Sequence, residues 1–213
     1  GAERGRSPTT TPGPTVSTGA PAVTSDPLSV AVLVNRTHPL PHGWVPPDLV
    51  EPDVAFNFGG HDPKRLMRRE AAVALASLFA AARADGARLV GVSGYRSEAR
   101  QRDLFAGYGR RDGVASAETY SAPPGTSEHQ TGLAIDVTGA DGRCAASDCF
   151  AARPEAAWLG AHAATFGFVV RYPAGKELVT GYRYEPWHLR YVGVALARRL
   201  SAAGSTLEDA ASS

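Results

Sequence analysis

The stretch Ser127-Glu128-His129-Gln130-Thr131-Gly132-Leu133-Ala134-Ile135-Asp136 places two potential metal ligands, His129 and Asp136, seven residues apart. On a straight strand this odd separation puts the two side chains on opposite faces. On a helix it puts them about 10.5 Å apart along the axis, too far for two ligands each about 2 Å from one ion. A shared metal therefore requires a bend, and Gly132 is the candidate because glycine adopts backbone angles that other residues avoid. We expect Asp136 on a strand over residues 133–137, with His129 reaching across from the preceding loop.

Two other segments carry polar side chains suited to catalysis. Ser93-Gly94-Tyr95-Arg96-Ser97 ends a predicted strand, and Glu185-Pro186-Trp187-His188 lies within another. Pro186 cannot donate to a neighbouring strand, which predicts an edge or a bulge that would turn Glu185 and His188 toward one cleft. His129, Asp136 and His188 form a plausible zinc set with a fourth position open for water. Each segment alone is a weak signal, since a lone histidine more often lies at the surface or in a hydrogen bond.

Helices and strands are mixed around these segments without a regular strand–helix–strand repeat. Apolar periodicity and capping residues predict helices over residues 63–84, 97–107, 154–166 and 194–203. Short apolar runs predict strands over residues 88–93, 133–137, 168–172 and 182–191. This order predicts an α+β fold rather than a doubly wound sheet.

Composition and charge set limits on the class of protein. The 213 residues are 43% hydrophobic and 20% charged, which suits one domain with a buried core. The net charge of +1 argues against a nucleic-acid partner, and we find no apolar run of the roughly 20 residues that a transmembrane segment needs. The start of the chain resembles no signal peptide, so we expect a mature or trimmed form whose export segment is missing.

The chain divides into three parts by composition. Residues 1–27 are rich in Thr, Pro and Ser and are predicted to be a flexible linker or tail, because they hold too little apolar surface to offset the entropy of ordering. Such a linker could tether the domain to a membrane or wall, or have no role. Residues 28–204 form the predicted domain, and residues 205–213 a small, polar C-terminal tail.

Cys144 and Cys149 are the two cysteines of the chain, and both fall in or at the end of a predicted loop over residues 139–148. Their spacing suits a local disulfide that staples the loop, and a disulfide fits an exported protein. Two free thiols are the alternative. Half of a metal site is a third reading, but the chain has no second cysteine pair.

Together the three polar segments resemble the zinc D-Ala-D-Ala carboxypeptidases of the VanY type, in the wider group that includes lysostaphin-like peptidases and the hedgehog domain. Ser127, His129 and Asp136 match the S-x-H-x(6)-D pattern, and Glu185, Trp187 and His188 match E-x-W-H. The S-G-Y-R-S pattern is met by residues 93–97, and residues 33–41 look like the N-terminal signature of the family. The resemblance covers about residues 30–200.

The resemblance implies a role for each site residue. The implied zinc ligands are His129, Asp136 and His188. Glu185 would be the general base that later passes its proton to the leaving amine, and Arg96 would polarise the scissile carbonyl and stabilise the oxyanion. The residues implied to hold the substrate near its terminal carboxylate are Gln101, Tyr120 and Ser127. The implied architecture is a single domain in which helices flank a small, mostly antiparallel sheet and zinc lies in a cleft on that sheet.

The function implied is that of an exported zinc D,D-carboxypeptidase. It would release the terminal D-Ala from peptidoglycan precursors or stem peptides that end in D-Ala-D-Ala, in the cell envelope or at the outer face of the cytoplasmic membrane. Glycopeptide resistance or cell-wall remodelling would follow. A D,D-dipeptidase, an L,D-carboxypeptidase or a peptidoglycan endopeptidase with the same metal site is the alternative. A noncatalytic wall-binding module is a further alternative. The sequence does not indicate an oligomeric state.

Overall fold

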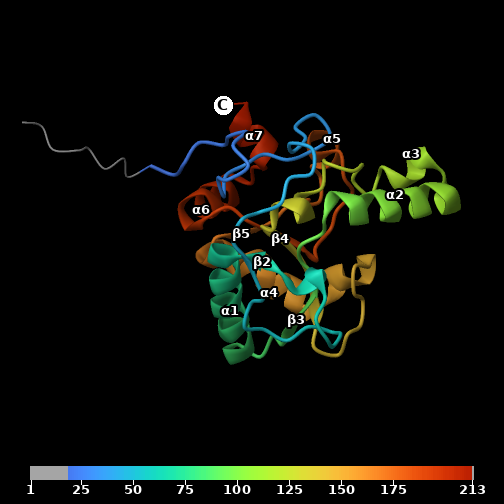
Figure 1. The fold of residues 1–213 in the computed structure, drawn as a ribbon. Helices are drawn as coiled ribbons and strands as arrows, with labels where there is room; N and C mark the ends of the chain where they lie inside the picture. Colours follow the sequence, from blue (N-terminus) through green and yellow to red (C-terminus); the bar gives the residue numbers. More distant parts are fainter. Residues whose placement is uncertain (1–18, 213) are drawn as a thin grey trace, which may run out of the picture.

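The computed structural model describes residues 19–212, so most of the linker predicted over residues 1–27 lies outside the described residues. The described part is an α+β domain built around one four-stranded antiparallel sheet, as the sequence predicts (Figure 1). The strands run in the order β3-β4-β6-β5. Their bounds are β3 (Leu89–Ser93), β4 (Ala134–Gly139), β5 (Phe168–Val170) and β6 (His188–Tyr191).

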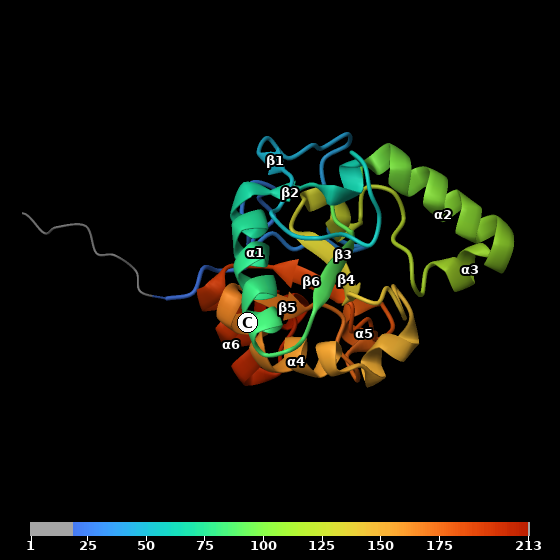
Figure 2. The ribbon, with the colours of Figure 1, turned by 90° about the horizontal axis from the view of Figure 1, so that it is seen from below.

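Helices surround this sheet. The α-helices are α1 (Arg69–Ala84), α2 (Glu98–Asp112), α3 (Val114–Ala117), α4 (Pro154–His162), α5 (Glu177–Thr180), α6 (Val194–Ala203) and α7 (Leu207–Ala211). The 3-10 helices are η1 (Pro63–Arg65), η2 (Glu128–Thr131), η3 (Asp148–Ala152) and η4 (Ala163–Phe166). In both ribbon views α2 and α3 project away from the sheet, while α1 and α4 lie close to it (Figure 2). None of the helices within residues 19–212 combines the length and apolarity needed to cross a membrane.

The first predicted helix is shorter than expected. Pro63–Arg65 forms only the 3-10 turn η1, and the chain then extends into strand β2 (Met67–Arg68), which pairs with β1 (Leu49–Val50). Helix α1 therefore begins at Arg69. Leu75 and Leu78 face the core and are fully buried, whereas Val73 is 65% exposed.

The strand predicted over residues 182–191 begins only at His188. A turn precedes it, in which the His188 N–H donates to the Glu185 carbonyl at 3.1 Å. Pro186 lies in this turn, and β6 pairs with β4 on one side and β5 on the other. The expectation that Pro186 marks an edge or a bulge is wrong, because the proline precedes a central strand.

The C-terminal residues depart from the predicted polar tail over residues 205–213. Helix α7 begins after Thr206, whose side chain accepts from the Asp209 N–H while the Asp209 carboxylate accepts from the Thr206 N–H. Leu207 is buried against Leu196 and Leu200 of α6. Leu207 and the ion pairs of Glu208 with Arg171 and of Asp209 with Lys176 dock the segment, although its small and polar composition predicted a tail.

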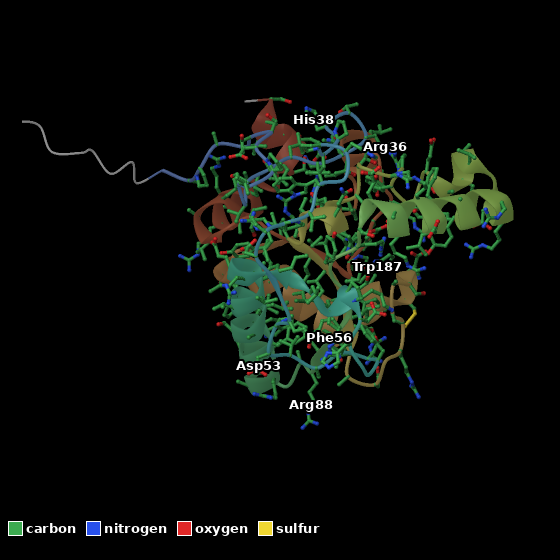
Figure 3. All side chains as sticks on the ribbon, viewed as in Figure 1. Arg36, His38, Asp53, Phe56, Arg88 and Trp187 are labelled. Carbon is green, nitrogen blue, oxygen red and sulfur yellow. A yellow bond between two sulfur atoms is a disulfide. The ribbon has the colours of Figure 1, made fainter. Side chains whose placement is uncertain are left out.

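The main core lies between α1, the sheet and α4. It contains Leu75 of α1, Ile135 of β4 and Leu189 of β6. Trp187, labelled in Figure 3, belongs to this core and is only 4% exposed. Because Asp136 and His188 adjoin these buried strand residues, the core fixes the backbone that carries them.

Candidate active site

The bend predicted between His129 and Asp136 is present at Gly132. Residues 128–131 form η2, and Gly132 follows with a left-handed φ of 68°. A Cβ on this glycine would lie 2.8 Å from Cδ2 of Leu49, so both the conformation and the space favour glycine. The backbone turns here from η2 into β4, and His129 and Asp136 thereby face the same cleft.

Three buried side chains form the candidate metal centre. Asp136 pairs with His188 in the β4–β6 register, and Oδ1 of Asp136 lies 3.1 Å from Nδ1 of His188. The other oxygen, Oδ2, lies 3.4 Å from Nε2 of His129. One ligand atom from each of the three residues lies within 4.8 Å of the others. Two imidazole nitrogens and one carboxylate oxygen match the donors that a catalytic zinc takes from protein.

Hydrogen bonds outside this set fix the orientation of each ring. Nδ1 of His129 lies 2.7 Å from the Gly94 carbonyl oxygen, which leaves Nε2 to face Asp136. In His188 the arrangement is reversed, with Nε2 3.4 Å from Oε2 of Glu128 and Nδ1 facing Asp136. Such outer partners set the tautomer and orientation of histidines that bind metals.

Electrostatics keep Asp136 ionised. Burial acts to raise the pKa of its carboxyl, but the His129 and His188 rings outweigh burial and hold the pKa well below its usual range. Asp136 is therefore in the ionised state in which a carboxylate can bind a cation.

Glu185 lies beside the three ligand residues. Its Oε2 is 3.8 Å from Nδ1 of His188. Burial raises the pKa of Glu185 to about 7, although His188 acts in the opposite direction. A carboxyl group that exchanges its proton near neutral pH is suited to general acid–base work.

Arg96 is held on the same cleft by two side chains. It donates through Nη1 to Oε1 of Gln101 at 2.8 Å and through Nη2 to Oγ of Ser93 at 3.3 Å. Burial lowers the pKa of Arg96, and the charges of Asp136 and Glu185 oppose this effect. Gln101 is itself fixed, because its Nε2 donates to the Ala122 carbonyl at 2.7 Å. The guanidinium is thus held in a fixed position at the cavity wall.

All eight predicted site residues line one cavity of about 180 Å³. They are Arg96, Gln101, Tyr120, Ser127, His129, Asp136, Glu185 and His188. Ser127 caps η2, since its Oγ accepts from the His129 N–H at 3.3 Å. Tyr120 lies at the rim, where its hydroxyl donates to Asp112. The structure places these residues together, and their individual roles stay predictions.

Sequence reasoning missed several residues of the cavity. Glu128, Tyr172 and Tyr182 line it, and the Tyr172 ring lies 4.9 Å from the His188 ring, measured between centroids. Buried Arg190 contacts Glu128 at 2.7 Å. Arg190 follows His188 by two residues, so the twofold period of a strand could have placed both on one face.

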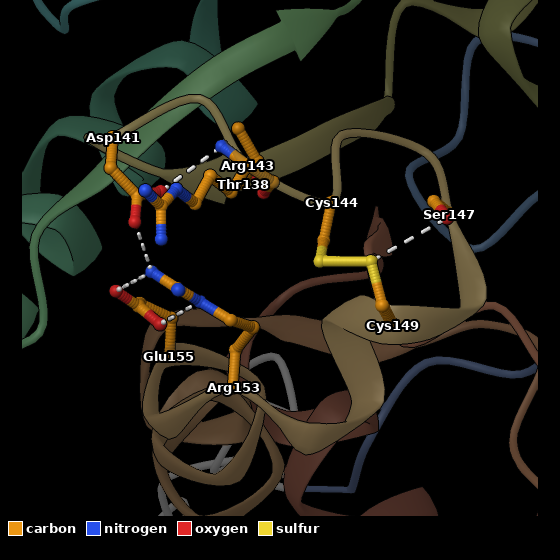
Figure 4. Close-up of a disulfide and its surroundings, with 8 residues drawn as sticks. All are labelled: Thr138, Asp141, Arg143, Cys144, Ser147, Cys149, Arg153 and Glu155. Carbon is orange, nitrogen blue, oxygen red and sulfur yellow. Dashed lines mark hydrogen bonds and ion pairs between the residues drawn. A yellow bond between two sulfur atoms is a disulfide. The ribbon is translucent and has the colours of Figure 1, made fainter.

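The predicted disulfide between Cys144 and Cys149 is present (Figure 4). Between the two cysteines, Ala146 reaches the cavity with a left-handed φ of 47°. Next to this loop, Arg153 pairs with Asp141 at 2.8 Å. The disulfide therefore closes a loop that forms part of the cleft wall.

A hydrolase that uses one zinc needs three protein ligands, an acid–base group close to them, and a positive charge for the developing oxyanion. The cleft supplies a residue for each, which places the chain among the zinc metallopeptidases. Comparison with known proteins agrees. The model of the VanY family, described as D-alanyl-D-alanine carboxypeptidase, matches residues 64–194, and the chain belongs to this family.

Individual relatives support the family. The chain is 42% identical over 184 residues to the YodJ protein of Bacillus subtilis, covering 86% of this chain and 67% of that protein. The structure of the LdcB LD-carboxypeptidase matches with a TM-score of 0.83 and 42% identity, over 87% of this chain and 86% of the other. A variant of the vancomycin-resistance D,D-pentapeptidase VanY in complex with Zn(II) matches with a TM-score of 0.69 and 35% identity. The match covers 86% of this chain and 98% of that chain. Zinc is therefore the cofactor that these ligands accept.

Proposed function

We propose that this chain is a zinc D,D-carboxypeptidase that hydrolyses the terminal D-Ala from peptidoglycan precursors or stem peptides ending in D-Ala-D-Ala. The observation that carries the proposal is that Glu185 and Arg96 share one small polar cleft with the three zinc ligands. Two alanine residues have only methyl side chains, which suits a cavity of about 180 Å³. The family description supports the same substrate.

The residues of the cleft divide the chemical work. Bound zinc supplies Lewis acidity and makes water more acidic. Glu185 takes a proton from the attacking water and returns it to the leaving amine of D-Ala. Arg96 stabilises the negative charge that develops on the scissile carbonyl oxygen. Gln101, Ser127 and Tyr120 hold the substrate near its terminal carboxylate.

An L,D-carboxypeptidase is the second candidate, because the likeness to the LdcB LD-carboxypeptidase has a TM-score of 0.83 against 0.69 for the VanY structure. Both activities release D-Ala and differ in the residue that precedes it. A D,D-dipeptidase or an endopeptidase would use the same ligands. A noncatalytic wall-binding module is disfavoured, since it would need neither Glu185 nor Arg96.

We also propose that the chain works in the cell envelope, at the outer face of the cytoplasmic membrane. The Cys144–Cys149 disulfide supports an oxidising compartment. There, loss of the terminal D-Ala would remove the dipeptide that glycopeptide antibiotics bind, so resistance or wall remodelling would be the consequence.

A panel of peptides tests the proposed specificity. The zinc-loaded chain is incubated with a pentapeptide ending in D-Ala-D-Ala, its D-Ala-D-Lac analogue, a tetrapeptide ending in L-Lys-D-Ala, and free D-Ala-D-Ala. Mass spectrometry then identifies the products. We expect the pentapeptide to lose one D-Ala at the highest kcat/KM. Faster cleavage of the tetrapeptide would establish the L,D activity instead, and faster cleavage of the free dipeptide would establish a dipeptidase.

A further inference from the structure

A group of four charged residues, three of them buried, lies behind the zinc ligand His188. We name it the Glu128 cluster, and its members are Glu128, Arg171, Arg190 and Glu208. Oε1 of Glu128 accepts from Nε of Arg171 at 2.6 Å and from Nη1 of Arg190 at 2.7 Å. The side chains of Glu128 and Arg190 are fully buried, and that of Arg171 is almost so. The cluster holds two carboxylates and two guanidiniums, so its net charge is zero. Such pairing offsets the cost of burying charged groups.

The two carboxylate oxygens of Glu128 have different partners. Both arginines bind one oxygen, Oε1, while the other oxygen, Oε2, faces Nε2 of His188 at 3.4 Å. Because Nδ1 of His188 faces Asp136, Nε2 is the nitrogen that carries the proton when Nδ1 binds a metal. Glu128 therefore accepts from the imidazole and fixes the direction in which Nδ1 points.

The same cluster also holds the backbone of the ligand. The N–H of Arg171 donates to the carbonyl of His188 at 3.1 Å, across the β5–β6 edge. Arg190 anchors the far side by donating through Nη2 to the carbonyls of Val30 and Val32, at 2.9 and 2.6 Å. The ring of His188 thus faces the Glu128 side chain, while its carbonyl accepts from the main-chain N–H of Arg171, whose side chain also binds Glu128.

The C-terminal helix α7 completes this arrangement. Glu208 binds the guanidinium of Arg171 through two parallel hydrogen bonds of 2.8 and 2.7 Å. Asn35 donates to Oε1 of Glu208 at 3.2 Å. A bidentate pair of this kind restricts the planar guanidinium to one orientation. A continuous path of contacts therefore runs from α7 through Arg171 and Glu128 to His188.

We propose that Glu128 is a positioning residue for the zinc ligand His188, and that Glu208 of α7 supports it by holding Arg171. The proposal assigns a role at the metal centre to α7, although no residue from Leu207 to Ala211 lines the cavity. It rests on the zinc site and holds for any peptide substrate.

Zinc affinity separates this role from a structural one. The test compares Glu128→Gln, Glu128→Asp and Glu208→Gln with the control Glu155→Gln. Glu155 pairs with Arg153 at 3.3 Å, and its side chain is 13% exposed, the same as that of Glu208. Each full-length variant is loaded with zinc, and competition with a chromophoric chelator gives the zinc Kd. The visible spectrum of the cobalt-substituted protein reports the ligand geometry.

We expect Glu128→Gln to weaken zinc binding by about 10- to 100-fold, the range typical for loss of an outer partner of a metal ligand. Glu208→Gln should weaken it by less than about tenfold, and both should alter the cobalt spectrum. Glu128→Asp keeps the charge between the arginines, so this variant should fold. Its shorter side chain withdraws the carboxylate from His188, so it should nevertheless bind zinc more weakly than wild type. Glu155→Gln should leave the zinc Kd and the spectrum unchanged.

A purely structural cluster predicts something else. Thermal unfolding of the metal-free and zinc-loaded forms would then shift equally, and folded variants would keep the wild-type Kd and spectrum. That result overturns the proposal. If Glu128→Gln does not fold, Glu128→Asp and Glu208→Gln decide between the two outcomes.

Discussion

Asp136 and His188 lie directly opposite one another on the central strands β4 and β6, with Oδ1 of the aspartate 3.1 Å from Nδ1 of the histidine. Antiparallel pairing brings these residues together although they are 52 positions apart in the sequence. His129 joins them because the chain turns at Gly132. Two core strands and one glycine therefore build most of the metal centre.

Loss of the Asp136 charge should weaken zinc binding strongly. We expect Asp136→Asn to raise the zinc Kd by more than about 100-fold, because it removes a charged ligand and not merely an outer partner. Chelator competition measures the effect. Asp141→Asn is the control, since Asp141 pairs with Arg153 at the surface. An unchanged Kd in Asp136→Asn would remove Asp136 from the ligand set.

The burial of Glu185 predicts a pH-dependent stability of the metal-free protein. Burial raises the pKa of Glu185 to about 7, so its neutral form is favoured on folding. The stabilisation is complete below the unfolded pKa of about 4.5 and is lost as the pH rises through about 7. Glu185→Gln is neutral at every pH. The unfolding free energy of wild type should therefore fall by roughly 3 kcal/mol relative to that of Glu185→Gln between pH 5 and pH 9, at about 1.4 kcal/mol per pKa unit.

Urea unfolding of the two metal-free proteins at both pH values measures this gain. If wild type and Glu185→Gln differ by the same free energy at pH 5 and pH 9, folding does not raise the pKa of Glu185.

The geometry of Arg96 should matter as much as its charge. Lysine cannot bond Gln101 and Ser93 through one planar fork, so Arg96→Lys should lower kcat by about 100- to 1,000-fold, as does removal of an oxyanion donor in other enzymes. Steady-state kinetics separate this effect from a change in KM. The matched control is Arg100→Lys, an exposed position of α2. Equal kcat values in Arg96→Lys and wild type would exclude a role for Arg96 in the transition state.

The disulfide should stabilise the folded chain modestly. Cys144 and Cys149 close a loop with a sequence separation of 5. Chain entropy predicts a loss of about 2 kcal/mol in the double variant Cys144→Ser/Cys149→Ser. Because Ala146 lines the cleft, KM should rise as well. Urea unfolding and kinetics test both statements, and mild reduction of the wild-type disulfide should reproduce them. A variant with wild-type stability and KM would show that the loop holds its place without the bond.

The sequence predicted the parts of the site that depend on local rules. The distance between His129 and Asp136 required a bend, and glycine indicated its place. The short motif around His188 also identified a ligand and a neighbouring carboxylate. Local rules were less reliable at element ends. The turn before His188 shortened a predicted strand, and the pairing of Met67–Arg68 with Leu49–Val50 delayed the start of α1.

The Glu128 cluster could not be predicted in this way. Arg171 is 43 residues from Glu128 and 37 from Glu208, and no periodic pattern connects them. Helix α7 could not be predicted for a related reason, since its one buried leucine lies among small and polar residues. Contacts that depend on the docking of distant segments follow from the fold and not from the motifs.

The central claim is that zinc held by His129, Asp136 and His188 acts together with Glu185. Its most direct test measures zinc content and D-Ala release for wild type and Glu185→Gln on a pentapeptide ending in D-Ala-D-Ala. We predict one zinc per chain in both proteins, with D-Ala released by wild type alone. Release at the wild-type rate by zinc-loaded Glu185→Gln, or a wild-type chain that hydrolyses the peptide without zinc, would contradict the claim.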